Sequence, residues 1–204
     1  MKQLYEEKYD KIDEQGNTKE AIMNKFTEKT LQTKEIFSGN IISVQVDNVL
    51  LPDGNESTRE IVKHPGAVAI IAITDDDKII FVEQYRKPLE RSLIEIPAGK
   101  LEPNEQPEIT ALRELEEETG YTTKKLDYIT SFYTSPGFAD EIMHIYYTNS
   151  ITRLENPAEL DDDEFVEVHY LTFDEAEQLI FEQKIYDAKT VYALMYLKNQ
   201  RMKK

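Results

Sequence analysis

Three glutamates are spaced so that an α-helix would bring their carboxylates together. Glu114, Glu117 and Glu118 stand at i, i+3 and i+4, positions that share one face of a helix. Carboxylates clustered in this way repel one another unless a cation neutralises them. Oxygen ligands without cysteine or histidine favour a hard ion, Mg²⁺ or Mn²⁺. Arg113 precedes Glu117 by four residues and can orient one carboxylate from outside the ligand set.

The plainer alternative is an acidic helix face that only meets water, with Arg113 and Glu117 as a surface ion pair. The surrounding residues favour the metal site. The segment Gly99–Tyr121 reads GKLEPNEQPEITALRELEEETGY. It fills every fixed position of the pattern G-x5-E-x7-R-E-U-x-E-E-x-G-U, where U is a bulky apolar residue. At typical residue frequencies a chance match has odds below roughly one in a million, so the pattern outweighs the solvated-face interpretation.

That pattern is the Nudix box, and the chain accordingly resembles the Nudix hydrolases, which cleave a nucleoside diphosphate linked to another moiety. The resemblance implies an α+β protein, an α/β/α sandwich around a mixed sheet, in which the box forms a loop–helix–loop. It also implies that the helix glutamates carry Mg²⁺. Glu114 and Glu118 match the principal family ligands, Glu117 lies close by, and the backbone carbonyl of Ala98 matches a further ligand. Such metals polarise the pyrophosphate and lower the pKa of the attacking water.

Segments outside the box resemble the ADP-ribose pyrophosphatase branch, whose members convert ADP-ribose to AMP and ribose 5-phosphate. The similarity covers about residues 28–200 and is strongest over 59–121. Two other functions stay open: hydrolysis of another nucleoside diphosphate sugar, such as GDP-mannose, and ADP-ribose sensing by a non-catalytic Nudix domain. The intact box and the lack of a DNA-binding helix-turn-helix or basic patch argue against the sensor.

Residues outside the box match substrate-binding positions of that branch. Arg86 matches an arginine that contacts the substrate phosphates, and its alternative is a salt bridge with a box glutamate. Arg59 and Glu60 match groups near the adenosine half, often supplied across a dimer interface, and their alternative is exposed charge at a strand edge. Where the family usually has an Arg or Lys near the adenine, this chain has Asn40, which leaves the adenine-contacting residue open.

Further matches concern the ribose and the surroundings of the metal. Ser135 and Gly137 border the family's ribose site, although a plain type I or II turn explains the segment equally well. Glu141 matches a recurrent carboxylate, with a cross-strand ion pair as its alternative. Glu102 and Glu105 can contact the metal surroundings or ribose hydroxyls, or Glu105 can simply favour the positive N-terminus of the box helix.

The general base of this branch comes from an acidic loop and not from the box. Here the loop covers residues 156–164, and Glu164 falls at the family's base position, with Asp162 as the fallback. A base near the metals takes the proton of the attacking water, and Arg113 completes the expected catalytic pair. A loop that is acidic only because it is solvated is the alternative.

The elements that must position these residues follow from the hydrophobic periodicity. The apolar run 67–73 predicts a strand buried on both faces, paired as a hairpin with a strand at 78–84. Residues 106–119 are expected to form the box helix, which Gly120 ends. The other expected strands cover 30–38, 41–50, 57–63, 93–96, 126–134, 140–149 and 165–171, and the other helices cover 173–183 and 187–200, with a further helical stretch plausible at Leu4–Ile12.

The composition changes at two points, which predicts three parts. Residues 1–28 form a charged extension, 29–64 a small antiparallel β lobe expected to form a homodimer, and 65–204 the Nudix hydrolase domain. The net charge of −16, from 24 Lys+Arg against 40 Asp+Glu, disfavours nucleic acid and anionic membranes as partners. A small nucleoside diphosphate sugar stays possible because divalent cations can shield its charge.

The remaining composition excludes other site classes. The chain has no cysteine, which removes disulfides, thiolate nucleophiles and Cys-type zinc sites. The three histidines, His64, His144 and His169, lie far apart without motif context and are expected to be structural. No apolar run approaches the roughly 20 residues of a membrane span, and the N-terminus is too acidic for a secretory signal. A cytoplasmic protein is expected.

Overall fold

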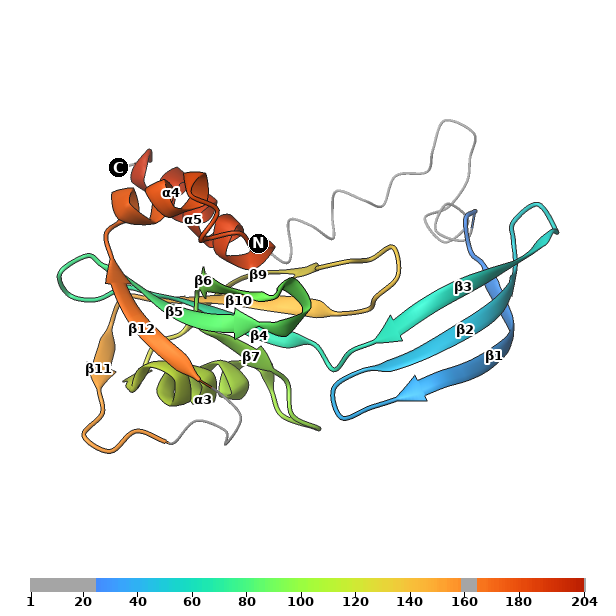
Figure 1. The fold of residues 1–204 in the computed structure, drawn as a ribbon, viewed down its shortest axis with the longest axis horizontal. Coiled ribbons are helices and arrows are strands. Elements are labelled where there is room, and N and C mark those ends of the chain that lie inside the picture. The colour runs from blue at the N-terminus through green and yellow to red at the C-terminus, as the bar shows by residue number, and fades with distance from the viewer. Residues whose placement is uncertain (1–24, 159–164, 204) are drawn as a thin grey trace, which may run out of the picture. The chain divides into compact units, whose positions relative to one another are not determined.

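The computed structural model describes residues 25–158 and 165–203. Contacts divide the chain into two compact units, one ending at Lys63 and the other beginning at His64, and Figure 1 draws both. The helical stretch expected near Leu4–Ile12 and the two acids Asp162 and Glu164 lie outside the described residues.

The first unit contains a three-stranded antiparallel sheet. Its strands are β1 (Lys29–Ser38), β2 (Ser43–Leu50) and β3 (Glu56–Lys63), in the order β1-β2-β3. The turn between β2 and β3 contains Gly54 at φ +87°, a conformation that favours glycine. The expected small antiparallel sheet is thus present.

The second unit contains three sheets and three α-helices among the described residues. The sheet orders are β7-β4-β10-β9, β12-β5-β6 and β11-β8, and only the β4–β10 pair is parallel within them. The strands are β4 (Ala67–Ala72), β5 (Ile79–Arg86), β6 (Arg91–Glu95), β7 (Ala98–Lys100), β8 (Tyr121–Thr123), β9 (Asp127–Tyr133), β10 (Ile142–Thr148), β11 (Ile151–Arg153) and β12 (Val166–Leu171). The helices are α3 (Pro107–Thr119), α4 (Phe173–Phe181) and α5 (Ala188–Arg201), with a short 3₁₀ turn at Lys87–Leu89.

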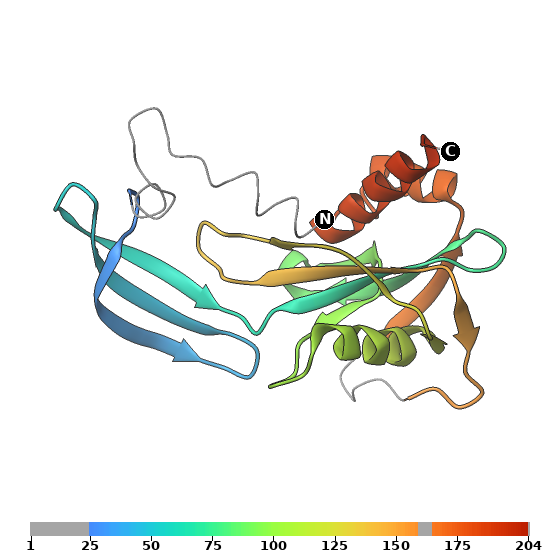
Figure 2. The same cartoon turned by 180° about the vertical axis from the view of Figure 1, so that it is seen from behind.

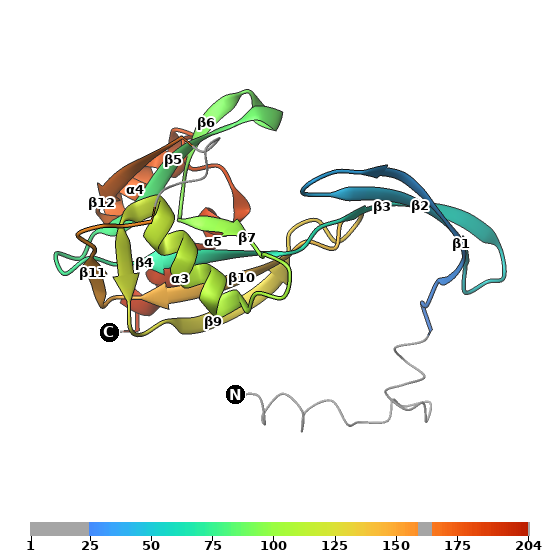
Figure 3. The ribbon, with the colours of Figure 1, turned by 90° about the horizontal axis from the view of Figure 1, so that it is seen from below.

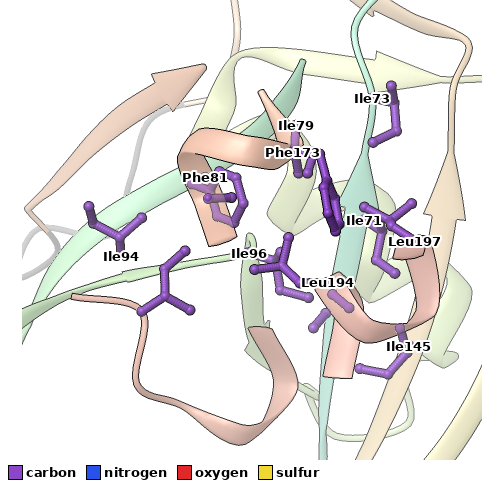
Figure 4. Close-up of a cluster of buried hydrophobic side chains, with 14 of the residues drawn as sticks. Ile71, Ile73, Ile79, Phe81, Ile94, Ile96, Ile145, Phe173, Leu194 and Leu197 are labelled. Atoms are coloured by element: carbon purple, nitrogen blue, oxygen red, sulfur yellow. The ribbon is translucent and has the colours of Figure 1, made fainter. Parts of the chain in front are cut away.

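Strand β4 is the centre of this unit, and all six of its residues are buried. Its side chains alternate between two cores, as the pleat of a strand requires. Ile71 belongs to the core that includes Leu194 of α5 (Figure 4). Ile70 belongs to the core that includes Leu115 of α3. Helix α3 therefore covers one side of the sheets while α4 and α5 cover the other (Figures 2 and 3), which confirms the expected α/β/α sandwich.

The expected hairpin between residues 67–73 and 78–84 is wrong. A turn is present, since the Thr74 amide donates to the Lys78 carbonyl at 2.9 Å, but only one bridge, Ile73–Ile79, follows it. Strand β4 then pairs with β10 and β7, while β5 pairs with β12 and β6. Strand β10 takes one edge of β4 along its whole length, and β7 takes the other edge at 67–69. Strand β5 diverges after the single bridge and enters another sheet.

The box helix forms where it was predicted. Helix α3 starts after Gln106, with Pro107 in its first turn, and Gly120 ends it at φ +74°, donating its amide to the Glu116 carbonyl. In contrast, β7, β8 and β11 were not predicted, because three residues are too few to show a period-2 pattern. No described helix has both the length and the apolarity that a membrane crossing needs.

Candidate active site

The box helix turns two of its glutamates toward strand β7. Leu115 is fully buried in the core, and this fixes the rotation of α3. Glu114 and Glu118, four residues apart, therefore lie on a largely covered face and are only 6% and 5% exposed. The Ala98 amide donates a hydrogen bond to Glu118 Oε2 at 2.9 Å. Helix α3 and strand β7, which carries the start of the box, are thus joined through the Glu118 carboxylate.

Gly99 is where strand β7 and the Glu114 side chain come closest. A Cβ atom built on Gly99 would lie 2.0 Å from the Glu114 carboxyl carbon. Such a contact is far inside van der Waals distance, so the first glycine of the box is required by close approach and not by its backbone angles. The space that glycine leaves beside the strand is occupied by a carboxylate.

Arg113 gathers three carboxylates around one guanidinium. Its Nη1 lies 2.9 Å from Glu114 Oε1 and 2.8 Å from Glu117 Oε2, and its Nη2 lies 3.2 Å from Glu105 Oε2. Burial alone would lower the pKa of Arg113, but these carboxylates outweigh it and raise the pKa above its usual range. The hydrogen bond from Arg113 in turn lowers the pKa of Glu105. Arg113 and Glu105 therefore stay charged at neutral pH.

The donor set fits a hard divalent cation. Within the described residues, no three Asp, Glu, His or Cys side chains already converge as a complete ligand set, since carboxylates of the box contact Arg113 and the Ala98 amide. The donors on this helix turn are nevertheless carboxylate oxygens alone, which suits Mg²⁺ or Mn²⁺. The recess that Gly99 leaves would hold a carboxylate and not a larger group. Glu114, Glu117 and Glu118 are the residues that would hold the ion.

A cleft of about 400 Å³ opens beside the first residues of the box, within the size range of small-molecule sites. Its walls come from the ends of β4, β5, β6, β7 and β10 and from the start of α5. Residues on its wall include Arg86, Glu95, Ala98, Gly99, Glu141 and Lys189. Cationic side chains and carboxylate side chains therefore line the same cleft next to the box.

Arg86 reaches this cleft while paired with Glu95 on β6. Its Nε and Nη2 donate to Glu95 Oε1 and Oε2 at 2.8 and 2.7 Å. The alternative foreseen for Arg86 was a box glutamate, whereas Glu95 lies four residues before the box. The hydrogen bond with Glu95 raises the pKa of Arg86. Burial acts to raise the pKa of Glu95, but Arg86 and Lys189 together lower it.

Sequence reasoning missed Glu95, Lys189 and Asp187. Lys189 Nζ contacts Glu95 Oε2 and also lies 3.0 Å from Asp187 Oδ1. The other Asp187 oxygen, Oδ2, is buried without a hydrogen-bond partner among the described residues. No pattern in the sequence could find this group, because Lys189 and Glu95 are 94 residues apart and meet only through the fold.

Glu141, the residue before β10, also lines the cleft. Its Oε2 accepts a hydrogen bond from Thr134 Oγ1 at 2.5 Å, and its Oε1 is 3.8 Å from His64 Nδ1. His64 lines the cleft as well, although it was expected to be structural. His64 Nδ1 accepts a hydrogen bond from the Gly66 amide at 3.1 Å, so the ring also fixes the start of β4.

Other predicted residues lie away from this cleft or in the other unit. Ser135 and Gly137 form the turn between β9 and β10, and Glu102 is exposed in the loop after β7; the residues described as lining the cleft do not include them. Arg59 and Glu60 belong to β3 of the first unit, where Arg59 Nη2 pairs with Glu28 Oε1 at 2.5 Å. That hydrogen bond raises the pKa of Arg59.

Known proteins resemble this chain over both of its units. A family model described as the NUDIX domain matches residues 63–194, and one described as the nucleoside diphosphate sugar hydrolase N-terminal domain matches residues 28–62. The chain is 59% identical to an ADP-ribose pyrophosphatase of Bacillus subtilis (strain 168), over 86% of this chain and 95% of that protein. It is 60% identical to a methanol dehydrogenase activator of Bacillus methanolicus, with the same coverage of both chains.

A solved structure is similar in fold. It is titled "Crystal structure of ADP compounds hydrolase" and aligns with a TM-score of 0.75, covering 85% of this chain and 94% of that one. At 20% identity this likeness concerns the fold alone.

Proposed function

Because this chain belongs to the Nudix family, we propose that it hydrolyses the pyrophosphate bond of ADP-ribose, giving AMP and ribose 5-phosphate. The observation that carries the proposal is the complete box: Glu114 and Glu118 lie against β7. Ala98 and Gly99 of that strand line a cleft that also holds Arg86. The relative from Bacillus subtilis, 59% identical and named an ADP-ribose pyrophosphatase, supports the choice of substrate.

The roles of the residues follow from their positions. Glu114, Glu117, Glu118 and the Ala98 carbonyl would hold Mg²⁺, with Mn²⁺ as a substitute. When bound, the ion supplies charge neutralisation and a lower pKa of the attacking water. Arg113 keeps the glutamates oriented through the contacts described above.

Residues outside the box bind the substrate and move the proton. Arg86 contacts the diphosphate and Glu141 contacts the substrate, both from the wall of the cleft. Glu164 takes the proton of the attacking water. Ser135, Gly137 and Glu102 border the ribose, and Arg59 and Glu60 serve the adenosine half. These five assignments rest on the family resemblance.

A substrate panel tests the proposal. Purified protein is incubated with Mg²⁺ and ADP-ribose, GDP-mannose, UDP-glucose or a dinucleotide polyphosphate, and the products are separated by chromatography. We expect ADP-ribose to have the highest kcat/KM and to yield AMP and ribose 5-phosphate in equal amounts. Faster turnover of GDP-mannose would favour the alternative, hydrolysis of another nucleoside diphosphate sugar. GDP-mannose is included because a relative of 29% identity is named a GDP-mannose pyrophosphatase.

A second role is favoured by the relative from Bacillus methanolicus, which is named a methanol dehydrogenase activator. We propose that this chain can also stimulate a dehydrogenase of that kind. Alcohol oxidation by a purified methanol dehydrogenase is measured with and without the protein. Stimulation that survives Glu118→Gln would mean that the effect needs binding and not hydrolysis. Tight ADP-ribose binding without product would instead favour the sensing function.

The first unit is proposed to form a homodimer. Its outer strand β1 is exposed along its whole length and carries the apolar residues Leu31, Ile36 and Phe37, about half exposed. A three-stranded sheet that exposes apolar side chains on its outer strand is stabilised when a second copy covers that strand. The match of residues 28–62 to an N-terminal domain of nucleoside diphosphate sugar hydrolases supports a distinct lobe followed by the Nudix domain. The cytoplasmic location stays a prediction that cell fractionation can test.

A further inference from the structure

We infer that Glu95, Lys189 and Asp187 form a chain of charges that positions Arg86 in the wall of the cleft. The inference rests on the proposed function, because Arg86 is the residue proposed to contact the substrate diphosphate. It adds the beginning of α5, more than 60 residues beyond the box in the sequence, to the parts of the fold on which turnover depends.

The first link is the pair between Arg86 and Glu95. Two parallel hydrogen bonds, 2.8 and 2.7 Å long, fix the plane of the guanidinium. The Glu95 side chain is 3% exposed, whereas that of Arg86 is 38% exposed. The pair is therefore anchored at its buried end. The third nitrogen, Nη1, takes no part in this pair. Since Arg86 lines the cleft, Nη1 can donate to an anion there.

The second link holds Glu95 itself. Lys189, 11% exposed, places its ammonium between Glu95 Oε2 and Asp187 Oδ1. A buried carboxylate with two cationic partners cannot turn without leaving a charge unpaired, and this is costly away from water. Glu95 is thus held in one rotamer. Because Arg86 donates two hydrogen bonds to Glu95, the Arg86 guanidinium is held in place as well.

The third link ties the charges to the backbone. Asp187 caps α5 by accepting a hydrogen bond from the Thr190 amide at 3.1 Å. The Thr190 hydroxyl in turn accepts one from the Ile96 amide at 3.0 Å, in a fully buried contact. On the adjoining strand, the Ile94 amide donates to the Lys184 carbonyl at 2.9 Å. The start of α5 is therefore fixed against β6, and the charged chain begins from a rigid support.

A purely stabilising network would also be buried and paired. The position of this one argues for more, because all four residues line the cleft beside the box. Arg86 is the member that is most exposed, and its guanidinium retains a free edge. The arrangement is what a substrate-binding arginine needs, since holding a cation in place before the substrate arrives lowers the ordering cost of binding.

Lys189→Met tests the inference, because it removes the ammonium and keeps most of the aliphatic stem. Lys198→Met is the matched control: Lys198 lies on the same helix and pairs with Glu177 at 2.7 Å on the surface. We expect Lys189→Met to lower kcat/KM for ADP-ribose about tenfold, the low end of what orienting partners cost in metal sites, and Lys189→Arg to restore part of it. The control should change kcat/KM less than twofold.

A double-mutant cycle separates positioning from stability. In an Arg86→Ala background, Lys189→Met should have no further effect on kcat/KM, because there is no guanidinium left to position. Full additivity of the two effects, or an unchanged kcat/KM with a lowered melting temperature in Lys189→Met, would overturn the inference.

An NMR readout makes the result independent of turnover. The Nε–H signal of Arg86 should be sharp and slow to exchange in the wild type, and broadened or lost in Lys189→Met. If the wild type hydrolyses no nucleoside diphosphate sugar but this loss occurs, the proposed function fails and the positioning stands. If the signal is unchanged in Lys189→Met, the positioning fails whatever the activity.

Discussion

Gly99 shows at the scale of one residue how the site constrains the sequence. The position looks like an ordinary strand residue by its backbone, yet a Cβ there would collide with the Glu114 carboxylate at 2.0 Å. The carboxylate is itself held by Arg113, so it cannot retreat without losing that ion pair. The demand for glycine at this position therefore comes from the glutamate of the helix.

Gly99→Ala should displace the Glu114 carboxylate and damage both stability and turnover. Overpacking of this kind costs about 1–3 kcal/mol of unfolding free energy, and kcat should fall more than tenfold because a proposed metal ligand moves. Urea unfolding and steady-state kinetics measure the two effects. Gly137→Ala is the packing control, since among the described residues no atom beyond its two chain neighbours lies within 4 Å of the Cβ it would add. The stability of this variant should not change.

The choice between Glu164 and Asp162 as the general base is a second question for single residues. Glu164→Gln should lower kcat by about 10²–10⁴-fold, the contribution typical of a general base, while Asp162→Asn should retain most activity. Rates are followed from pH 5 to 9, because loss of the base also removes the acid limb of the kcat profile. Retained activity in Glu164→Gln together with its loss in Asp162→Asn would reverse the assignment.

The sequence was enough to predict the residues of the box, but it was not enough to predict the charged residues that line the neighbouring cleft. Glu114, Glu117 and Glu118 were predicted because their spacing places them on one helix face and the complete box pattern surrounds them. Glu95, Lys189 and Asp187 carry no such pattern, since their meeting depends on how β6 and the start of α5 pack. His64 was placed among structural residues for the same reason, although it lines the cleft.

At the scale of elements, long periodic segments were predicted well and pairing partners were not. Helix α3 has a proline start, an apolar face and a glycine end, which are all local signals. The partner of β4 is a different kind of question, because a strand buried on both faces gives no local sign of which neighbour takes each edge. Strand β7, which carries the start of the box, was not predicted because it has only three residues.

The contact between β6 and α5 should make the second unit sensitive to acid. The folded-state pKa of Glu95 is below its ordinary value, so its pairing stabilises the fold above the unfolded pKa, about 4.5, and is lost as the pH falls through the lower folded pKa. Glu95→Gln should cost about 3 kcal/mol at pH 7, the low end for a broken buried ion pair.

Denaturant unfolding of wild type and Glu95→Gln at several pH values measures this. The difference between them should be constant from pH 8 to 6 and shrink below about pH 4.5. A difference that stays the same down to pH 3 would show that the carboxylate charge of Glu95 is not what stabilises the contact.

At the scale of the whole molecule, the charge of −16 acts differently in different places. Part of it lies in the box, where divalent cations would reverse the local field and admit a diphosphate. We expect the remainder to disfavour binding to long nucleic acids and anionic membranes. The same protein can therefore repel polyanions and accept a small diphosphate that arrives with its metals.

The proposed dimer can be tested on the exposed strand β1. Ile36→Lys places a charge at a position that is 54% exposed, so it should leave the fold of the chain intact and weaken the dimer by at least tenfold in Kd. Sedimentation velocity over a concentration series measures this. Thr33→Lys, on the same exposed strand, serves as the control for added charge, and a wild type that is monomeric at all concentrations would refute the proposal.

The central claim is that the box glutamates carry a metal-dependent hydrolysis of ADP-ribose. Its most direct test is the rate of AMP formation from ADP-ribose with Mg²⁺, measured for the wild type and for Glu118→Gln, with EDTA as the metal-free condition. Glutamine keeps the shape and can still accept the Ala98 hydrogen bond, so the melting temperature should hold. We predict that the wild-type rate falls to background with EDTA and about a hundredfold or more in Glu118→Gln. A variant that turns over ADP-ribose at the wild-type rate would contradict the account.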